Sequence, residues 1–166
     1  MGVHQLFLSM GGNLGNKSKI FDSTKRHIEA QIGQLAKISS IYESDSWGFH
    51  SRSLFWNQVV LVETRLSPEN ILTEIRIIED HFGRRREPGK YRSRKMDLDI
   101  LFYDDLIFNS EELTIPHPFI AQRNFVLEPL YEIAPEYFHP VLKEKISQIR
   151  LNCKDSLKVR KIEFFG

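Results

Sequence analysis

Hydrophobic and polar positions along the chain follow two periodicities, and the changes between them mark out six elements. Apolar residues at 6–10, closed by a glycine-rich loop at 11–15, indicate a buried strand and a tight loop. Apolar positions three to four residues apart indicate two helices, the first ended by Gly33 and the second begun by Ser67-Pro68-Glu69 and ended by Gly83. The predicted elements are strand 6–10, helix 17–32, strand 37–42, strand 55–64, helix 67–82 and strand 96–103.

This order of elements is that of the ferredoxin-like βαββαβ unit. We therefore expect an α+β fold with one antiparallel sheet and these two helices on one face. Residues 104–166 add to the core, with short strands at 106–108 and 157–165 and a short helix or turn at 125–133. The chain has 166 residues, of which 41% are hydrophobic, and this is typical of one soluble globular domain spanning 1–166.

The last predicted core strand carries two acids on one face. The period of two places Asp97 and Asp99 together, and the other residues on that face are Leu101 and Tyr103. The opposite, core-facing side chains are Leu98, Ile100 and Phe102. Two carboxylates roughly 6.5–7 Å apart are unfavourable unless a cation neutralises them, and hard oxygen donors of this kind suit Mg²⁺ bound with phosphate. The alternative is that each acid pairs with a nearby arginine.

The net charge of +1 hides an uneven distribution. Residues 84–95 hold seven basic residues and one acidic residue, a local +6, which leaves −5 over the other 154 residues. A concentrated basic segment directly before two acids predicts a clamp for a polyphosphate whose metal the acids hold. The Pro88-Gly89 break inside it indicates a loop that closes on substrate. A solvated loop and a nucleic-acid surface are the alternatives, and the acidic remainder of the chain argues against the second.

Composition also limits where the protein works. No apolar run approaches the ~20 residues that cross a bilayer, and the first residues lack the features of a signal peptide. The one cysteine, Cys153, makes neither an internal disulfide nor a zinc site. We expect a cytoplasmic protein without a membrane partner.

Two further segments hold candidate binding residues. Asn57 stands among aromatic residues, which suits a flat heteroaromatic ligand, although core packing also explains that pattern; the aromatic residues are Trp47, Phe55 and Trp56. His117 lies between two prolines, and a surface histidine in a rigid turn is the alternative to a binding role. The glycines at 11–15 match neither a phosphate loop nor a dinucleotide fingerprint. They are expected to permit a tight turn, with close substrate approach as a further use.

Together these segments resemble the 6-hydroxymethyl-7,8-dihydropterin pyrophosphokinases of folate biosynthesis over about residues 6–140. The segments that carry the likeness are Gly11-Gly12-Asn13-Leu14-Gly15, Phe55-x-Asn57, Ile78-Glu79-x3-Gly83-Arg84, Arg94-x2-Asp97-Leu98-Asp99-Ile100, Leu113-x2-Pro116-His117-Pro118 and Arg123-x-Phe125-Val126-Leu127-x-Pro129-Leu130. The glycine loop alone would be a weak signal, but the last three segments in this order are highly specific. The ferredoxin-like core of that family agrees with the predicted strand order.

The resemblance implies transfer of a diphosphate from ATP to the hydroxymethyl oxygen of the dihydropterin, with release of AMP. It also implies that Asp97 and Asp99 hold two Mg²⁺ ions that bridge the ATP phosphates. The implied catalytic residues are Arg84, Arg94, Asp97 and Asp99. The implied ATP-binding residues are Glu79, Arg86, Lys90, Tyr91, Arg94, Ile100, Thr114, His117 and Arg123.

The same resemblance places the pterin ring between Phe55 and Phe125, with Asn57 reading its polar edge. Main-chain groups near Ser44, Asp45 and Trp47 complete the implied pocket. The chain departs from the family at several of these positions: Ser44-Asp45-Ser46 stands for Thr-x-Pro, Tyr91 for a tryptophan, Arg92-Ser93-Arg94 for Gly-Pro-Arg, and Phe55 for a frequent tyrosine. Stacking survives each aromatic exchange, so we expect altered affinity with activity retained.

The expected partners are therefore ATP and the dihydropterin, with no nucleic acid. The protein is expected to be a monomer, with a homodimer as the alternative. Two rival functions remain at this point. One is an RNA-binding module on a ferredoxin-like sheet, and the other is a Mg²⁺-dependent kinase or nucleotidyltransferase on the same fold.

Overall fold

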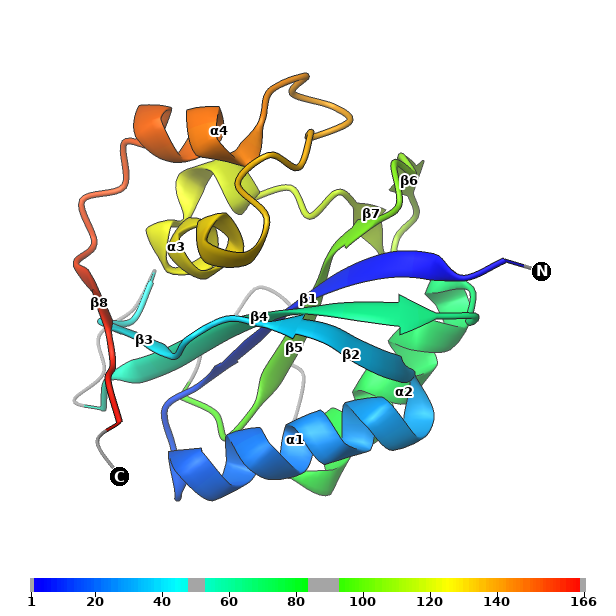
Figure 1. The fold of residues 1–166 in the computed structure, drawn as a ribbon. Helices are drawn as coiled ribbons and strands as arrows, with labels where there is room; N and C mark the ends of the chain where they lie inside the picture. The colour runs from blue at the N-terminus through cyan, green and yellow to red at the C-terminus, as the bar shows by residue number, and fades with distance from the viewer. Residues whose placement is uncertain (1, 48–52, 84–92, 165–166) are drawn as a thin grey trace.

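A computed structural model describes residues 2–47, 53–83 and 93–164 of the chain (Figure 1). A six-stranded antiparallel sheet forms its centre, with strands in the order β5-β1-β4-β3-β8 and with β2 paired to β4 beside β3. The sheet strands are β1 His4–Gly12, β2 Gly33–Ile38, β3 Tyr42–Ser44, β4 Phe55–Thr64, β5 Asp97–Tyr103 and β8 Val159–Lys161. The helices are α1 Lys17–Gln31, α2 Pro68–His81, α3 Asn124–Ile133 and α4 Ile146–Asn152, with a 3-10 turn η1 at Ile120–Gln122.

The ferredoxin-like core is confirmed. Its four strands lie in the order β5-β1-β4-β2, and β1 pairs antiparallel with both of its neighbours. Helices α1 and α2 cover one face of this sheet, as predicted, and α3 and α4 lie on the other (Figure 1). We call these the α1/α2 face and the α3 face.

Local sequence signals account for the two core helices. The Asn16 side chain caps α1 by accepting from the backbone N–H of Lys19 at 3.2 Å. Ser67 caps α2 in the same way, and Pro68 opens its first turn. Gly83 follows the helix with a φ of +78°, a conformation that costs glycine little, so the predicted helix end is confirmed.

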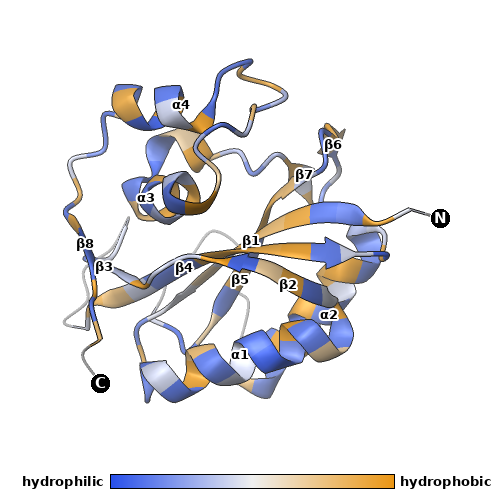
Figure 2. Cartoon of the chain, viewed as in Figure 1, coloured by the Kyte–Doolittle hydropathy of each residue, from blue (hydrophilic) through white to orange (hydrophobic). Residues whose placement is uncertain are grey.

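Two hydrophobic clusters lie on the two sides of the sheet. Even-numbered β4 residues such as Val60 and Val62 pack with Ile28 and Ile75 of the two core helices. The odd-numbered Val59 and Leu61 pack with residues of α3 and α4. Figure 2 shows hydrophobic residues on the sides of the helices that face the sheet. The alternation of a strand buried on both faces explains this division.

The predicted strand 37–42 is wrong in its bounds, because the structure has two strands there. β2 begins at Gly33, which was predicted only to end a helix, and β3 is a separate short strand. A Cβ on Gly33 would lie 2.2 Å from the backbone oxygen of Glu63, so only glycine allows the chain to enter the sheet at this point.

A β-bulge in β5 changes which way its last residues point. Phe7 is paired with Phe102 whereas Leu8 is paired with Ile100, so Leu101 is an extra residue in the ladder. Phe102 therefore packs edge-on against Phe7 in the α3-face cluster, at 6.0 Å between ring centroids, and Tyr103 joins the opposite cluster. The prediction for these two side chains is wrong, while the prediction for residues 97–100 is confirmed.

The C-terminal part holds more structure than the sequence predicted. The helix expected at 125–133 is confirmed as α3, and α4 was not predicted. The strand expected at 106–108 is wrong in its bounds, because β6 is Phe108–Asn109, which pairs with β7 at Thr114–Ile115. The strand expected at 157–165 is only the three residues of β8.

Candidate active site

The two acids of β5 lie on the α3 face, at the end of the sheet where small and polar residues replace the core. Leu98 and Ile100 are buried in the cluster under α1 and α2, so the alternating Asp97 and Asp99 point to the other side. In the ladder, Asp99 lies opposite Ser9 and Asp97 opposite Gly11. The cross-strand neighbours of both acids are therefore small residues.

Arg94 is held directly beside Asp97. Its Nη1 donates to Asp97 Oδ2 at 2.5 Å, and both side chains are at most 16% exposed. The guanidinium carbon also lies 5.9 Å from the ring centroid of Phe55. The arginine pairing that was the alternative to metal binding is therefore present at Asp97. The same arginine also adjoins Phe55, a predicted pterin-stacking ring.

Asn13 fixes this segment, and sequence reasoning did not select it. The Asn13 Oδ1 accepts from the Arg94 backbone N–H at 2.8 Å, and the Asn13 backbone N–H donates to the Arg94 carbonyl at 2.9 Å. A Cβ on Gly12 would lie 2.2 Å from the backbone oxygen of Lys95. The glycine loop thus allows close approach to the backbone of residues 94–95. The presence of Asn13, a polar residue among glycines, was the feature of the sequence that could have indicated this contact.

Asn57 is oriented by β3. Its amide nitrogen donates to the Tyr42 carbonyl at 3.1 Å and to Ser44 Oγ at 3.0 Å, and both Asn57 and Ser44 are buried. The donors of the amide are engaged by the fold, which fixes the direction of its oxygen. Asp45, which follows Ser44, is exposed.

A cluster of aromatic rings surrounds the Arg123 guanidinium. Its central carbon lies 4.4 Å from the ring centroid of Trp47, 4.9 Å from that of Phe119 and 5.6 Å from that of Phe125. The structure brings together three predicted site residues here, from the start of α3 and from the segment after β3. Phe119 was not predicted, although it stands two residues after His117.

His117 adjoins this cluster, with its ring centroid 5.9 Å from that of Phe119. Its backbone N–H donates to the Leu101 carbonyl at 3.0 Å, so the Pro-His-Pro segment is anchored at the β5 bulge. Burial, reinforced by the charge of Arg123 and opposed by that of Asp97, lowers the pKa of His117 to about 4. Its Nδ1 accepts from the Phe119 N–H at 3.1 Å, so the neutral ring carries its proton on Nε2.

Two predicted nucleotide residues, Glu79 and Ile100, have side chains buried away from the face of Asp97 and Asp99. Ile100 is buried in the α1/α2-face cluster. Glu79 of α2 is 1% exposed, and its Oε2 accepts from the backbone N–H of Leu98 at 2.8 Å. Thr114 is in β7, where its hydroxyl donates to Asn109 at 3.1 Å.

The remaining predictions fall on the basic loop. The predicted residues Arg84, Arg86, Lys90 and Tyr91, and the proposed loop closure, lie outside the described residues. Among residues 2–47, 53–83 and 93–164, no group of three or more His, Cys, Asp or Glu side chains could hold a metal ion. In the same ranges, no helix is long and apolar enough to cross a membrane.

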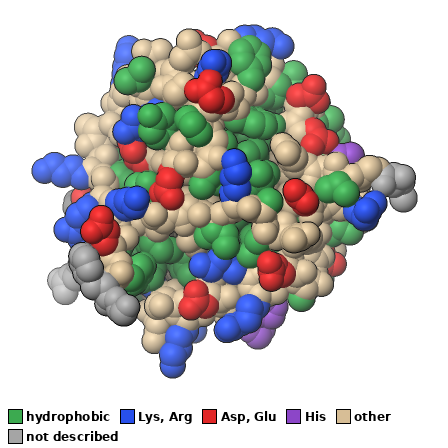
Figure 3. All heavy atoms as spheres, in the orientation of Figure 1, with side chains coloured by type: hydrophobic (Ala, Val, Ile, Leu, Met, Phe, Trp, Pro, Cys, Tyr) green, Lys and Arg blue, Asp and Glu red, His purple; other side chains and the backbone are tan. Residues whose placement is uncertain are grey.

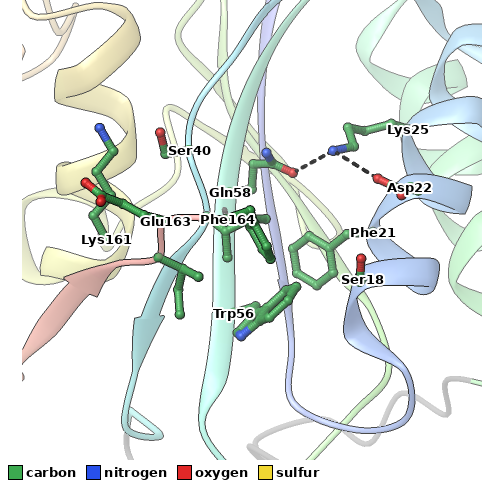
Figure 4. A pocket seen from close by; sticks show the side chains of 12 residues that line it. Ser18, Phe21, Asp22, Lys25, Ser40, Trp56, Gln58, Lys161, Glu163 and Phe164 are labelled. Atoms are coloured by element: carbon green, nitrogen blue, oxygen red, sulfur yellow. Dashed lines mark hydrogen bonds and ion pairs between the residues drawn. The ribbon is translucent and has the colours of Figure 1, made fainter. Parts of the chain in front are cut away.

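A separate cavity lies on the α1/α2 face, and its walls come from α1, β4 and the end of the chain (Figure 4). Trp56 and Gln58 line it from β4, so the intervening Asn57 points to the other face of the sheet. Trp56 packs against Phe21 of α1 at 5.9 Å between centroids. Core packing, the alternative considered for the aromatic residues around Asn57, accounts for Trp56 but not for Phe55.

The chain is similar in sequence to known proteins of one family. Residues 7–135 match the family described as 7,8-dihydro-6-hydroxymethylpterin-pyrophosphokinase. The chain is 33% identical over 145 residues to the 2-amino-4-hydroxy-6-hydroxymethyldihydropteridine pyrophosphokinase of Aquifex aeolicus, covering 87% of this chain and 89% of that protein. It is 36% identical over 138 residues to the protein of the same name from Porphyromonas gingivalis, covering 81% and 93%.

Longer proteins contain the same unit. The chain is 40% identical over 136 residues to the folic acid synthesis protein fol1 of Pneumocystis carinii, covering 82% of this chain but only 18% of that protein. A solved HPPK-DHPS chain in complex with substrates superposes with a TM-score of 0.73 at 16% identity, covering 91% of this chain and 43% of the solved one. That structural likeness supports the fold.

The family match spans most of the chain, and relatives of similar length are at least 33% identical to it. The reaction expected from the sequence, pyrophosphoryl transfer from ATP to hydroxymethyldihydropterin in folate biosynthesis, is confirmed at the level of the family. The chain belongs to the 7,8-dihydro-6-hydroxymethylpterin-pyrophosphokinase family.

Proposed function

We propose that the enzyme acts at the polar end of the α3 face, with Asp97 and Asp99 holding two Mg²⁺ ions together with ATP. The observation that carries this is that the two carboxylates share one side of β5, with Arg94 bound to Asp97. Two carboxylates completed by phosphate oxygens and water are a donor set that Mg²⁺ accepts. When bound, Mg²⁺ neutralises phosphate charge and lowers the pKa of the attacking hydroxyl.

The triphosphate is proposed to lie along the cationic and hydrogen-bonding side chains of this face. Arg94 and Arg123 offer planar guanidinium donors for phosphate oxygens. His117, neutral with its proton on Nε2, offers a donor without adding a charge. The other proposed nucleotide contacts are Arg86, Lys90, Tyr91 and Thr114. Contacts with Glu79 and Ile100 are also proposed, with the nucleotide reaching them around β5, the edge strand of the sheet.

The dihydropterin is proposed to stack between Phe55 and Phe125. Phe55 lies under Arg94, and Phe125 lies beside Arg123, so each ring adjoins a cation that would face the phosphates. The proposed polar contacts come from the fixed Asn57 amide and from main-chain groups near Ser44, Asp45 and Trp47. A flat substrate held this way would present its hydroxymethyl group toward the acids.

The proposed reaction is a displacement at the β-phosphorus of ATP. The hydroxymethyl oxygen forms a bond to this phosphorus while the bond to the oxygen shared with the α-phosphate breaks. AMP leaves with that oxygen, and the hydroxyl proton passes to solvent. Positioning and charge neutralisation supply most of the rate in such transfers, and the proposed contributors are Arg84, Arg94, Asp97 and Asp99.

The domain organisation, oligomeric state and location of the enzyme are also proposed. Residues 1–166 are proposed to form one pyrophosphokinase domain, because the two core clusters lie on opposite sides of one sheet. The enzyme is proposed to be a cytoplasmic monomer. On the face in Figure 3, Lys and Arg side chains are interspersed with Asp and Glu, which does not favour a nucleic-acid track there.

The test is an assay of the enzyme with ATP, Mg²⁺ and the reduced hydroxymethylpterin, followed by separation of the nucleotides. Formation of AMP only when pterin is present, and its loss on chelation of the metal, is the expected result. ADP in place of AMP would identify a simple kinase. No turnover would favour a binding role such as RNA recognition, and turnover without a divalent cation would overturn the metal proposal.

A further inference from the structure

Residues 153–164, here called the C-terminal segment, lie beyond the part of the chain that matches the family. The segment leaves α4, passes the start of α3 and reaches the sheet beside β3, where it forms β8 (Figure 1). It thereby touches β3 and the start of α3, two of the elements that carry proposed pterin contacts. No function was predicted for residues 141–166 from the sequence.

The first contact is a reciprocal pair between Asp155 and Asn124. The Asp155 Oδ2 accepts from the Asn124 backbone N–H at 3.0 Å, and the Asn124 side chain donates to the Asp155 carbonyl at 2.7 Å. Asp155 is itself oriented, because its Oδ1 accepts from the Leu157 N–H at 3.0 Å. Both members of the pair are half-buried.

This pair serves as the cap of α3. The N-cap position of the helix is Arg123, a residue type whose side chain has no acceptor for a first-turn N–H. A carboxylate from another part of the chain supplies that acceptor, and its negative charge suits a helix N-terminus. Asn124 stands between Arg123 and Phe125, so the cap acts on the backbone of the two proposed site residues.

The second contact is with β3. The register pairs Ser44 with Val159 and Glu43 with Arg160, and the Arg160 guanidinium binds the Glu43 carboxylate. Ser44 is the residue whose hydroxyl accepts from the Asn57 amide. One short segment therefore contacts the start of α3 and the strand that orients Asn57.

We propose that the C-terminal segment sets the geometry of the pterin pocket, with Asp155 as a positioning residue that acts through Asn124 on Arg123 and Phe125. The inference rests on the proposed placement of the pterin. Asp155 does not touch the substrate in this account. Its effect comes from fixing where the first turn of α3 begins, because small displacements of binding groups strongly reduce catalysis.

The experiment compares Asp155→Ala and Asp155→Asn with the unaltered enzyme in steady-state kinetics. It is done at a temperature where circular dichroism shows each variant folded. Asp155→Ala is expected to raise the KM for the dihydropterin roughly five- to tenfold, below the ~10²-fold that a 1 Å misplacement can cost. Asp155→Asn keeps an acceptor for the Asn124 N–H, so a smaller rise is expected. Ser156→Ala changes an exposed neighbour in the same segment and should match the unaltered enzyme.

A purely structural role gives a different result. In that case Asp155→Ala lowers the melting temperature but leaves both kcat and the pterin KM within twofold, and the proposal is wrong. Phe125→Ala separates this inference from the function it rests on. If Phe125→Ala leaves the pterin KM unchanged, the placement of the pterin fails; if it raises that KM while Asp155→Ala does not, only the positioning role fails.

Discussion

The two faces of the sheet share the same strands but differ in how far they are covered. On the α1/α2 face, apolar side chains continue along β1 from Leu6 to Met10 and along β5 at Leu98 and Ile100. On the α3 face, the apolar cluster uses only one end of the strands. Toward the glycine loop, that face instead carries Ser9, Gly11, Asn57, Asp97 and Asp99.

The difference separates the residues that fold the protein from those proposed to bind substrate. At this end of the sheet β5 contributes alternately to an apolar core and to a polar face, so a one-residue step along β5 leads from a buried leucine to a candidate metal ligand. The core behind the site then holds the acids in place. Substitutions on the two faces should therefore have different consequences, which can be measured separately.

Removing a carboxylate on the α3 face should have the largest effect on activity. Asp97→Asn or Asp99→Asn is expected to lower kcat on the order of 10²–10³-fold, because each takes a negative ligand from the charged centre of the reaction. The check is steady-state turnover at saturating Mg²⁺ with the folded fraction confirmed. Asp105→Asn, at an exposed position after the strand, is the matched control. Near-normal turnover in either site variant would contradict the metal assignment.

The residue between those acids should affect stability instead. Leu98 is 2% exposed, and Leu98→Ala is expected to cost about 2–5 kcal/mol of unfolding free energy through lost burial and an internal cavity. Denaturant titration measures this, and Leu151→Ala is the comparison because Leu151 is 79% exposed. Equal unfolding free energies for the two leucine variants would mean that the faces do not differ as described.

Arg94 connects the two proposed substrates, so its loss should act mainly on turnover. Arg94→Ala is expected to lower kcat roughly 10–100-fold, because a positioned cation is lost where charge develops. The KM for ATP should change less. Arg26→Ala, on an exposed part of α1, serves as a control for loss of one positive charge. An unchanged kcat for Arg94→Ala would remove this residue from the proposed machinery.

The smallest expected effect is the pH dependence of stability caused by His117. Its pKa is about 4 in the folded protein against a usual 6.5, so the unfolded chain binds more protons between these values. Stability contributed by the neutral ring is therefore present above about pH 6.5 and is lost as the pH falls toward 4. His117→Asn should flatten this part of the stability curve. His139 is also buried with a lowered pKa, so His139→Asn measures its separate share.

The order and bounds of the main elements could be predicted because they depend on local signals. Strand β4 was placed at its observed bounds by its apolar run, and α2 by the Ser67 cap and by Gly83. The division of one predicted strand into β2 and β3, and the bulge at Leu101, could not be predicted. Both depend on which backbone groups meet across the sheet, and this is decided by tertiary packing.

The candidate site shows the same limit. Asp97 and Asp99 stood out because acids are unusual in an apolar strand, and the resemblance supplied the aromatic and cationic residues around them. Asn13 was missed because its partner, Arg94, lies far along the chain. Phe119 was missed because its role depends on where the Arg123 side chain lies. Asp155 was missed for the same reason, because its partner lies 31 residues earlier.

The central claim is that both substrates bind on the α3 face, with the metal ions at Asp97 and Asp99. The most direct test is a crystal structure of the enzyme with Mg²⁺, a non-hydrolysable ATP analogue and the dihydropterin. The account predicts two ions contacting Asp97 and Asp99, and the pterin ring between Phe55 and Phe125. Nucleotide or pterin bound on the α1/α2 face, in the cavity lined by Trp56 and Gln58, would contradict it.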